Sequence, residues 1–329
     1  MNLSALKFRD FRIYLAGNLF AVNATWMQRV TIGWIAWDLT SSATFVGFIA
    51  FVNFAPAMVT GPLFGVLIDR MRITQVAKLT QLLLLTISLG FYLFFTFRFL
   101  DEILLSFLSF LSGLVTSAYN PVRLSLAPRL VDRTSVASVV SIVAINFNLA
   151  RLTGPAIGGW LIAGWGISSA LLVQTVCYLP FIFTISLLRP RERSSSTTEN
   201  EPFIAALQNG IRHALSNTLI RQAFLVTVLY AFLIRGTLEI LPVIADGVFS
   251  RGATGLGLLT SSAGFGALVA GVTKAFTPSQ MTGELPKFAL ANALLGIGLL
   301  PLIGLSSSWD LTLFCISYLG FSGLSLIHI

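Results

Sequence analysis

Charged side chains inside apolar stretches are the residues of this sequence most able to do chemistry. Glu239 is the clearest case, because it is the only acid well inside an apolar run and follows Arg235 by one helical turn. Loss of water favours the neutral form of a carboxyl group, whereas a neighbouring cation favours the charged form. If opening a cavity changed that balance, the pair could carry a proton across a membrane. A permanent Arg235–Glu239 pair, needed only for insertion of the segment, explains the pattern equally well.

Polar residues also recur along the first apolar run. Four of them share one helix face, at offsets of four, seven and four residues: Tyr14, Asn18, Thr25 and Arg29. A polar stripe on an apolar helix is expected to face protein or a watery cavity. We therefore expect this stripe, with the adjacent Gln28, to border a substrate cavity. Asp38 is a second candidate for proton exchange, although its position at the end of the run places it at the outer water interface.

The fifth apolar run combines a charge with helix-bending and small residues. Arg151 is followed by four such residues, namely Gly154, Pro155, Gly158 and Gly159. Proline kinks a helix, and glycines allow another helix to approach closely. The run therefore predicts a bent, tightly packed helix around which two halves could rock, with Arg151 and Asn148 beside the cavity. The alternatives are a structural ion pair for Arg151 and a purely structural packing role for the glycines.

Composition places the chain in a membrane. Of its 329 residues, 55% are hydrophobic and 10% are charged, whereas soluble domains have about 25% charged residues. The net charge of +8 is explained by basic residues in cytoplasmic loops, and not by nucleic-acid binding. Cys177 and Cys315 lie in apolar runs and are interpreted as packing residues. The sequence contains neither a phosphate loop nor a nucleophile–base pattern that would indicate an enzyme. We expect neither a metal nor a cofactor.

The elements that position these residues are predicted to be transmembrane helices. A bilayer core needs about twenty helical residues, and ten runs are long enough: 12–38, 44–68, 76–97, 103–127, 136–162, 167–188, 220–246, 253–276, 286–305 and 309–327. We expect a six-helix bundle over 1–188, a cytoplasmic linker with an amphipathic surface helix over 189–219, and a partial four-helix bundle over 220–329. Glycine-rich segments of the second and eighth runs, and of the fourth and tenth, form a weak internal repeat. Two helices of a second six-helix bundle are then expected to be missing, as in a fragment.

Basic residues gather on one side of the predicted membrane. That side carries the amino terminus, the linker and most of the loop cations, among them Lys7, Arg9, Arg129, Arg133, Arg189, Arg191 and Arg193. The opposite side carries only Arg98 and Arg251, beside several acids. The asymmetry predicts a cytoplasmic amino terminus.

Two motifs resemble the major facilitator superfamily. The loop after the second run carries Gly65, Leu67, Asp69 and Arg70, which resemble its G-x-L-x-D-R gating signature. The match is partial, because Arg72, Ile73 and Thr74 follow where that family usually has glycine and further bases; an ordinary positive-inside loop is the alternative. Gly154-Pro-x-x-Gly-Gly resembles the motif of its exporting antiporters. Segments 26–42, 119–131 and 210–213 resemble the branch of transmembrane secretion effectors and enterobactin exporters.

The resemblance implies a fold, a function and a location. The fold is an all-α membrane protein with a central cavity between two helix bundles. The function is alternating-access, proton-coupled export of a small, partly hydrophobic molecule such as a siderophore or drug. The protein is expected in the bacterial cytoplasmic membrane, as a monomer in the lipid bilayer that uses the proton gradient. An uncoupled facilitator in which Glu239 is structural, and a non-transporting receptor or secretion partner, remain alternatives.

Overall fold

The computed structural model describes residues 3–69, 72–191, 236–276, 285–305 and 307–326, together with the isolated residues 212, 216, 217 and 228. Within these ranges it does not describe the side chains of 58, 59, 61–69, 271, 274–276, 285–290, 293 and 323–326. Most of the predicted linker helix, together with Arg235, therefore lies outside the described residues.

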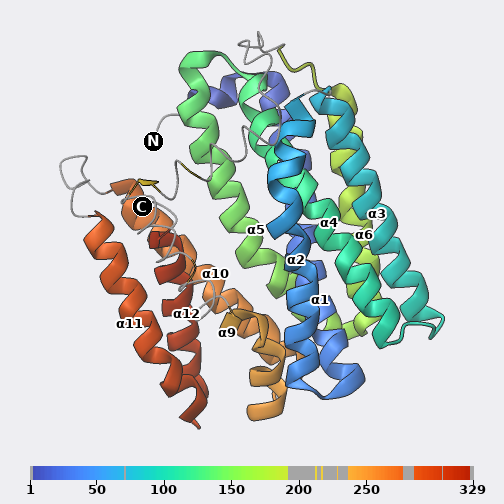
Figure 1. The fold of residues 1–329 in the computed structure, drawn as a ribbon, viewed down its shortest axis with the longest axis vertical. Helices are drawn as coiled ribbons and strands as arrows, with labels where there is room; N and C mark the ends of the chain where they lie inside the picture. Colours follow the sequence, from blue (N-terminus) through green and yellow to red (C-terminus); the bar gives the residue numbers. More distant parts are fainter. Residues whose placement is uncertain are drawn as a thin grey trace.

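Helices make up almost all of the described chain (Figure 1). The first half contains α1 (Arg9–Thr40), α2 (Ala43–Asp69), α3 (Ile73–Thr96), α4 (Glu102–Leu126), α5 (Val136–Trp165) and α6 (Ile167–Leu187). The second half contains α9 (Gly236–Glu239), the π-helical turn η5 (Val243–Val248), α10 (Gly252–Phe276), α11 (Leu285–Leu305) and α12 (Trp309–Leu326). In the part of the chain that the structure describes, the nine long helices begin and end within three residues of the predicted runs. Of the predicted span 220–246, only residue 228 and the part from Gly236 onwards are described, and that last part is broken into α9 and η5.

The helices form two bundles, which confirms the predicted fold class. In the first bundle α1 packs against α5 and α6, α2 against α4, and α3 against α4 and α6. In the second, α12 packs against both α10 and α11. The main contact between the bundles is the packing of α5 against α10. Figure 1 shows these two helices approaching each other near the turns that follow α1 and α5. We call this end of the molecule the distal end. The amino terminus lies at the opposite, proximal end.

Close glycine contacts occur at equivalent places in the two bundles. A Cβ atom added to Gly113 of α4 would overlap the carbonyl group of Asn53 in α2. A Cβ atom added to Gly320 of α12 would overlap the carbonyl group of Ala263 in α10. Both glycines lie in the segments that form the weak internal repeat. The α2–α4 and α10–α12 pairs therefore use the same packing device, which supports two related halves.

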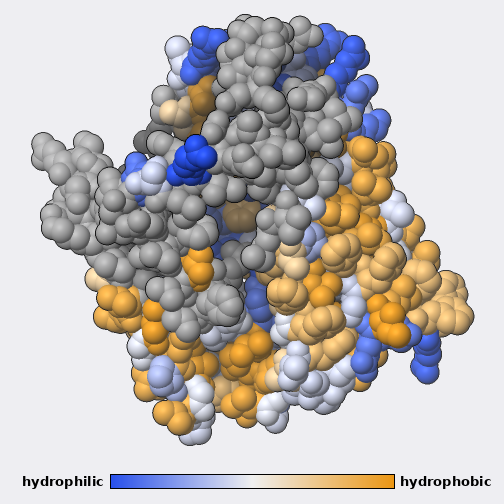
Figure 2. All heavy atoms as spheres, in the orientation of Figure 1, coloured by the Kyte–Doolittle hydropathy of each residue, from blue (hydrophilic) through white to orange (hydrophobic). Residues whose placement is uncertain are grey.

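The outer surface is suited to lipid. Five described helical segments are long and apolar enough to cross a membrane, namely Ile73–Thr96, Glu102–Leu130, Arg133–Trp165, Ile167–Leu187 and Gly252–Ala270. Large hydrophobic side chains such as Phe107, Phe183 and Val176 are exposed on them. Figure 2 shows hydrophobic residues covering much of the described face, with hydrophilic residues gathered towards its ends. This is the surface of a multi-pass membrane protein.

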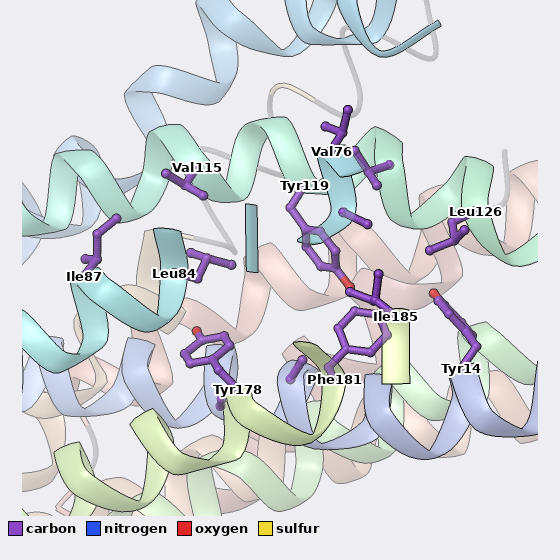
Figure 3. Packing of buried hydrophobic residues seen from close by; sticks show 14 of the residues in the cluster. Tyr14, Val76, Leu84, Ile87, Val115, Tyr119, Leu126, Tyr178, Phe181 and Ile185 are labelled. Carbon is purple, nitrogen blue, oxygen red and sulfur yellow. The ribbon is translucent and has the colours of Figure 1, made fainter. Parts of the chain in front are cut away.

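The interior of the first bundle is closely packed around aromatic side chains. Tyr14 of α1 and Phe181 of α6 make an edge-to-face contact with ring centroids 5.6 Å apart. Tyr119 of α4 contacts the same Phe181 ring at 6.3 Å. Figure 3 shows these rings pointing towards one another between α1, α4 and α6. This packing anchors the proximal half of α1 and leaves its middle section to face the second bundle.

Candidate functional site

A cavity of about 320 Å³ lies between the two bundles. Its walls come from α1, α2, α4 and α5 on one side, and from α9, the residues after it and α10 on the other. Its described polar lining is Thr25, Gln28, Arg29, Asn53, Ser112, Thr116, Tyr119, Asn120, Arg123, Arg151, Glu239 and Thr260. Trp26, Phe54 and Phe147 supply aromatic surface. A largely apolar wall with a few converging polar groups is typical of a small-molecule site.

An ion pair joins the two bundles across this cavity. The Nε atom of Arg29 donates a hydrogen bond of 3.1 Å to Oε2 of Glu239, and its Nη2 atom pairs with Oε1. The side chains are 25% and 16% exposed, so both are largely removed from solvent. Two parallel hydrogen bonds make an arginine–carboxylate pair strong and directional. The described partner of Glu239 is therefore Arg29 of the other bundle, whereas the sequence pattern had suggested Arg235 of its own segment.

Aromatic rings hold Arg29 in place. Its guanidinium carbon lies 4.4 Å from the ring centroid of Phe54 and 5.3 Å from that of Trp26. Such cation–π contacts stabilise a cation best where water is excluded. Arg29 is thus oriented towards Glu239 by groups on its own bundle, and Glu239 supplies the contact that crosses between bundles.

Two more arginines lie on the same aromatic array. The guanidinium carbon of Arg123 lies 4.5 Å from the ring centroid of Phe147, and that of Arg151 lies 5.7 Å from the Trp26 ring. The two rings touch edge to face, with centroids 5.7 Å apart. The array therefore carries three permanent positive charges along one wall. Glu239 is the only acid among the described residues that line the cavity.

The predicted stripe on α1 divides into two parts. Thr25, Gln28 and Arg29 line the cavity as expected. The structure places Asn18 and Tyr14 away from it, because the proximal half of α1 is enclosed by α4, α5 and α6. Asn18 is fully buried, donates to the Tyr119 hydroxyl at 2.9 Å and accepts from Asn146 at 3.1 Å. Residues on one face of α1 therefore lie in different environments, because neighbouring helices cover only part of the length of that face.

Gln28 links the cavity wall to polar groups behind it. Its Nε2 atom donates to Ser112 Oγ at 3.0 Å, and its Oε1 atom accepts from the Tyr178 hydroxyl at 3.0 Å. Thr25 lies 3.5 Å from the same hydroxyl. These bonds tie α1 to α4 and α6 and fix the wall against which a ligand would bind.

The two predicted residues of α5 lie in different places. Arg151 lines the cavity, as does Pro155, and α5 continues unbroken past this proline. Asn148 does not line it, and its amide donates to the Ala144 carbonyl of its own helix at 2.9 Å. Because Asn148 and Arg151 are only three residues apart in the sequence, their spacing could not show which side chain points towards the second bundle.

The glycines of α5 form close contacts on two sides. A Cβ atom on Gly154 would lie 2.7 Å from the Cβ atom of Trp26, and one on Gly159 would lie 2.6 Å from the Cα atom of Gly257 in α10. A Cβ atom on Gly158 would come no closer than 3.6 Å to Met27, which is an ordinary contact. The predicted close approach is confirmed at Gly154 and Gly159. The Gly159–Gly257 contact brings the bundles together at the distal side of the cavity.

A second contact joins the two bundles at the distal end. The indole Nε1 atom of Trp37 in α1 donates a hydrogen bond of 2.8 Å to Oδ2 of Asp246 in η5. Asp246 also accepts from the backbone N–H of Gly252 at 3.2 Å, which fixes the start of α10. Asp38, the neighbour of Trp37, is exposed, as expected for a residue at the water interface.

The comparisons with known proteins agree with this architecture. Residues 1–322 match the family of transmembrane secretion effectors. The chain belongs to this family of major facilitator transporters. As a transporter, it is not an enzyme. It is 22% identical over 322 residues to the staphyloferrin A transporter of Staphylococcus aureus (strain NCTC 8325 / PS 47), covering 92% of this chain and 79% of the relative.

Solved transporters share its fold. A bacterial homologue of the iron transporter ferroportin, in an inward-facing state, has a TM-score of 0.68 and 16% identity over 96% of this chain and 82% of its own. A bacterial homologue of the human lysosomal transporter Spinster, also inward-facing and unoccupied, has a TM-score of 0.67 and 13% identity over 97% and 74%. At these identities the likeness concerns the fold.

The gating signature of this transporter is only partly described. The side chains of Gly65 and Asp69 and the whole of Arg70 lie outside the described residues. Arg72 is exposed immediately before α3. The gating role of this loop, and of the α5 glycines, stays a prediction.

Several cavity residues of this transporter were missed from the sequence. Arg123 carried the same signal as Arg151, a charge within an apolar run, but it lies near the end of its run and was noted only for the family resemblance. Asn53, Phe54 and Phe147 carried no separate signal. Their part in the site becomes visible only when α2 and α5 are placed beside α1.

Proposed function

We propose that this transporter is a proton-coupled exporter of a small, partly hydrophobic molecule that works by alternating access. The observation that carries the proposal is the Arg29–Glu239 pair. Its two members belong to different bundles and both line the cavity, so a movement that opens the distal end must separate them. A carboxylate that loses its cation in a place of low dielectric constant is stabilised by taking up a proton.

The cycle follows from this geometry. In the structure, the ion pair, the Trp37–Asp246 hydrogen bond and the Gly159–Gly257 contact hold the distal end closed. Opening of the distal end exposes Glu239 to the outside, where it takes up a proton while the substrate leaves. Return to the closed conformation restores Arg29 beside Glu239, and the proton leaves towards the cytoplasm. One direction of proton movement is thereby linked to the opposite movement of substrate.

The charge distribution supports the orientation that this cycle needs. Arg129, Arg133, Arg189 and Arg191 lie at the proximal end of the first bundle, whereas the distal end carries Arg98 beside Asp101 and Glu102. Basic residues favour the cytoplasmic side. We therefore place the amino terminus and the proximal end in the cytoplasm of a bacterial cell, and the distal end outside its cytoplasmic membrane, with the chain as a monomer.

The substrate class rests on the cavity and on one relative. The aromatic wall of Trp26, Phe54 and Phe147 suits a partly hydrophobic molecule. The S. aureus relative is named for transport of staphyloferrin A. A siderophore or drug of comparable size is the proposed cargo.

Transport into inside-out vesicles tests the function. With staphyloferrin A as the probe, we expect accumulation that requires a pH gradient, and alkalinisation of the acidified lumen upon substrate addition. Glu239→Gln should abolish both responses to the gradient, whereas Asp38→Asn, a matched change of an exposed acid, should keep them. Substrate accumulation that is independent of the pH gradient and unchanged in Glu239→Gln would establish an uncoupled facilitator, in which the ion pair only stabilises the protein.

A further inference from the structure

Three separate segments of the chain are held together at the proximal end of the first bundle. They are η1 (Ser4–Lys7) with the start of α1, the short helices η2 (Ala127–Leu130) and η3 (Arg133–Ser135) between α4 and α5, and residues 188–191 after α6. The backbone N–H of Arg191 donates to the carbonyl oxygen of Arg129 at 2.9 Å. The backbone N–H of Arg189 donates to Oδ2 of Asp10 at 3.2 Å. These hydrogen bonds fix one surface that belongs entirely to the first bundle.

This surface carries mostly basic side chains. They form what we call the cationic patch, which consists of Lys7, Arg9, Arg129, Arg133, Arg189 and Arg191. The same segments contain only two acids, Asp10 and Asp132, and Asp132 is paired with Arg191. No other member of the patch has an ion-pair partner among the described residues. The Nε atom of Arg129 is buried and makes no hydrogen bond to a described residue, and such a donor normally has a partner supplied by a ligand or water.

Exposed apolar side chains lie directly beside the patch. Phe183 and Leu187 share one face of α6 and are 68% and 48% exposed, and the span ends just before Arg189. Val140 in the second turn of α5 is also exposed, shortly after Arg133. Figure 2 shows hydrophilic residues at this end of the described face, next to a hydrophobic surface. A nucleic acid or a soluble acidic protein would use the cations alone, whereas a lipid has both an anionic head group and apolar chains that fit this arrangement.

We infer that the cationic patch binds the head group of an anionic phospholipid, and that an acyl chain of this lipid lies along the exposed face of α6. Basic residues at the end of a membrane span attract anionic head groups. Arg9 and Arg189 are neighbours in this site, because the side chain of Asp10 accepts the hydrogen bond from the backbone of Arg189. Figure 1 shows α6 on the side of the first bundle that faces away from the second bundle. The site is therefore separate from the cavity and independent of the proposed proton coupling.

Titration of the purified protein in detergent with single lipids, followed by native mass spectrometry, tests the inference. The probes are phosphatidylglycerol and phosphatidylcholine with the same acyl chains. We expect phosphatidylglycerol to bind with a dissociation constant at least tenfold lower, and the difference to shrink as ionic strength rises. Equal dissociation constants for the two lipids would overturn the inference.

A soluble probe distinguishes a lipid from a free phosphate. Glycerol 3-phosphate carries the charged group of the lipid without its acyl chains, so we expect it to displace phosphatidylglycerol only at concentrations far above that of the lipid. Displacement at a concentration equal to that of the lipid would show a site for a free phosphate group, and would overturn the assignment to lipid.

Substitutions then identify the binding residues. A basic residue near an anionic lipid surface contributes about fivefold to binding. Arg189→Gln should therefore raise the dissociation constant for phosphatidylglycerol about fivefold, and Arg9→Gln combined with Arg189→Gln about 25-fold, while phosphatidylcholine binding stays unchanged. Arg189→Lys keeps the charge and should keep the affinity. Unchanged phosphatidylglycerol binding in the double variant would refute the site.

The matched control removes an arginine from the opposite end of the molecule. Arg98 is exposed and lies between the exposed Phe97 and Phe99, so it also has a charge beside apolar surface. It is close in sequence to the acids Asp101 and Glu102, and Arg98→Gln should leave binding of both lipids unchanged. A loss equal to that of Arg189→Gln would show unspecific attraction of lipid to any surface arginine. Each variant is compared after its elution volume and melting temperature agree with those of the parent, and Arg189→Lys serves where a glutamine variant fails to fold.

The acidic linker of the same chain is the competing occupant of the patch. It follows Arg191 in the sequence and carries Glu199 and Glu201. If the linker occupied the patch, Glu199→Gln combined with Glu201→Gln would tighten phosphatidylglycerol binding at least tenfold, and this result would overturn the lipid assignment. We expect the affinity of this variant to equal that of the parent.

Discussion

Replacing Gly159 with alanine would shift the balance between the two conformations of the transport cycle. The added Cβ atom would lie 2.6 Å from the Cα atom of Gly257 and 3.0 Å from the carbonyl oxygen of Ala253. Both neighbours are backbone atoms of α10, so no side-chain rotation can relieve the overlap. α5 and α10 must move apart, and this is the movement that opens the distal end. The closed conformation is therefore destabilised, whereas a distally open conformation has no such overlap.

The expected shift is large enough to measure. Overpacking of a well-packed contact costs about 1–3 kcal/mol, and about 1.4 kcal/mol corresponds to a tenfold change in an equilibrium constant. Gly159→Ala should therefore raise the ratio of open to closed molecules by about 5- to 150-fold. Gly158→Ala is the control, because its Cβ atom would lie 3.6 Å from the nearest atom of Met27 and should leave the ratio unchanged.

Spin labels at the distal end report the ratio directly. Cysteines at Ala43 and Ser307 are suitable, since both positions are exposed and lie at the distal ends of different bundles. The native Cys177 and Cys315 are replaced by alanine first. In Gly159→Ala, the population at longer label-to-label distance should grow. A distance distribution identical to that of the parent, in a variant that remains folded, would refute the view that this contact closes the distal end.

Three further substitutions test the packing that supports the site. Trp37→Phe removes the hydrogen bond to Asp246 and should favour the open state by about 1 kcal/mol, seen as the same change in label distance. Asn18→Leu removes two buried hydrogen bonds and should lower the free energy of unfolding by about 1–3 kcal/mol, as measured by chemical denaturation. The control Asn148→Ala should change this free energy little in the same assay. Gly113→Ala would overlap the Asn53 carbonyl and should lower the melting temperature markedly, whereas Gly47→Ala, with open space around it, should not. Stability of Gly113→Ala equal to that of Gly47→Ala would contradict the close α2–α4 packing.

Hydropathy predicted the helices well because the physics behind it is local. A membrane helix must present about twenty apolar residues to lipid wherever it lies in the fold, so boundaries such as Val136 and Ile167 could be located without knowing the neighbours. The seventh span was the exception. Where it is described, the chain changes from α9 to a π-helical turn between Glu239 and Val248. Such irregularities depend on tertiary contacts and are frequent at functional sites, and an average over twenty residues does not show them.

The partner of Glu239 could not be predicted for the opposite reason. Sequence spacing compares residues within one helix and therefore favoured Arg235, one turn away. The described ion pair joins positions 210 residues apart, and it exists because the first and second bundles face each other; Arg235 lies outside the described residues. Tyr14 and Asn18 show the same limit, since their helix face was assigned correctly while the helices that cover it were unknown.

A charge inside an apolar run nevertheless proved to be the most useful single signal in the sequence. Arg29, Arg151 and Glu239 were each singled out for this reason, and all three line one cavity. The physical basis is that lipid rejects a charged side chain regardless of fold, so such residues must converge on the space that lipid does not reach. Arg123 satisfies the same rule and lines the same cavity. What the rule does not supply is the pairing within that space, because the contact between Arg29 and Glu239 depends on how the two bundles face each other.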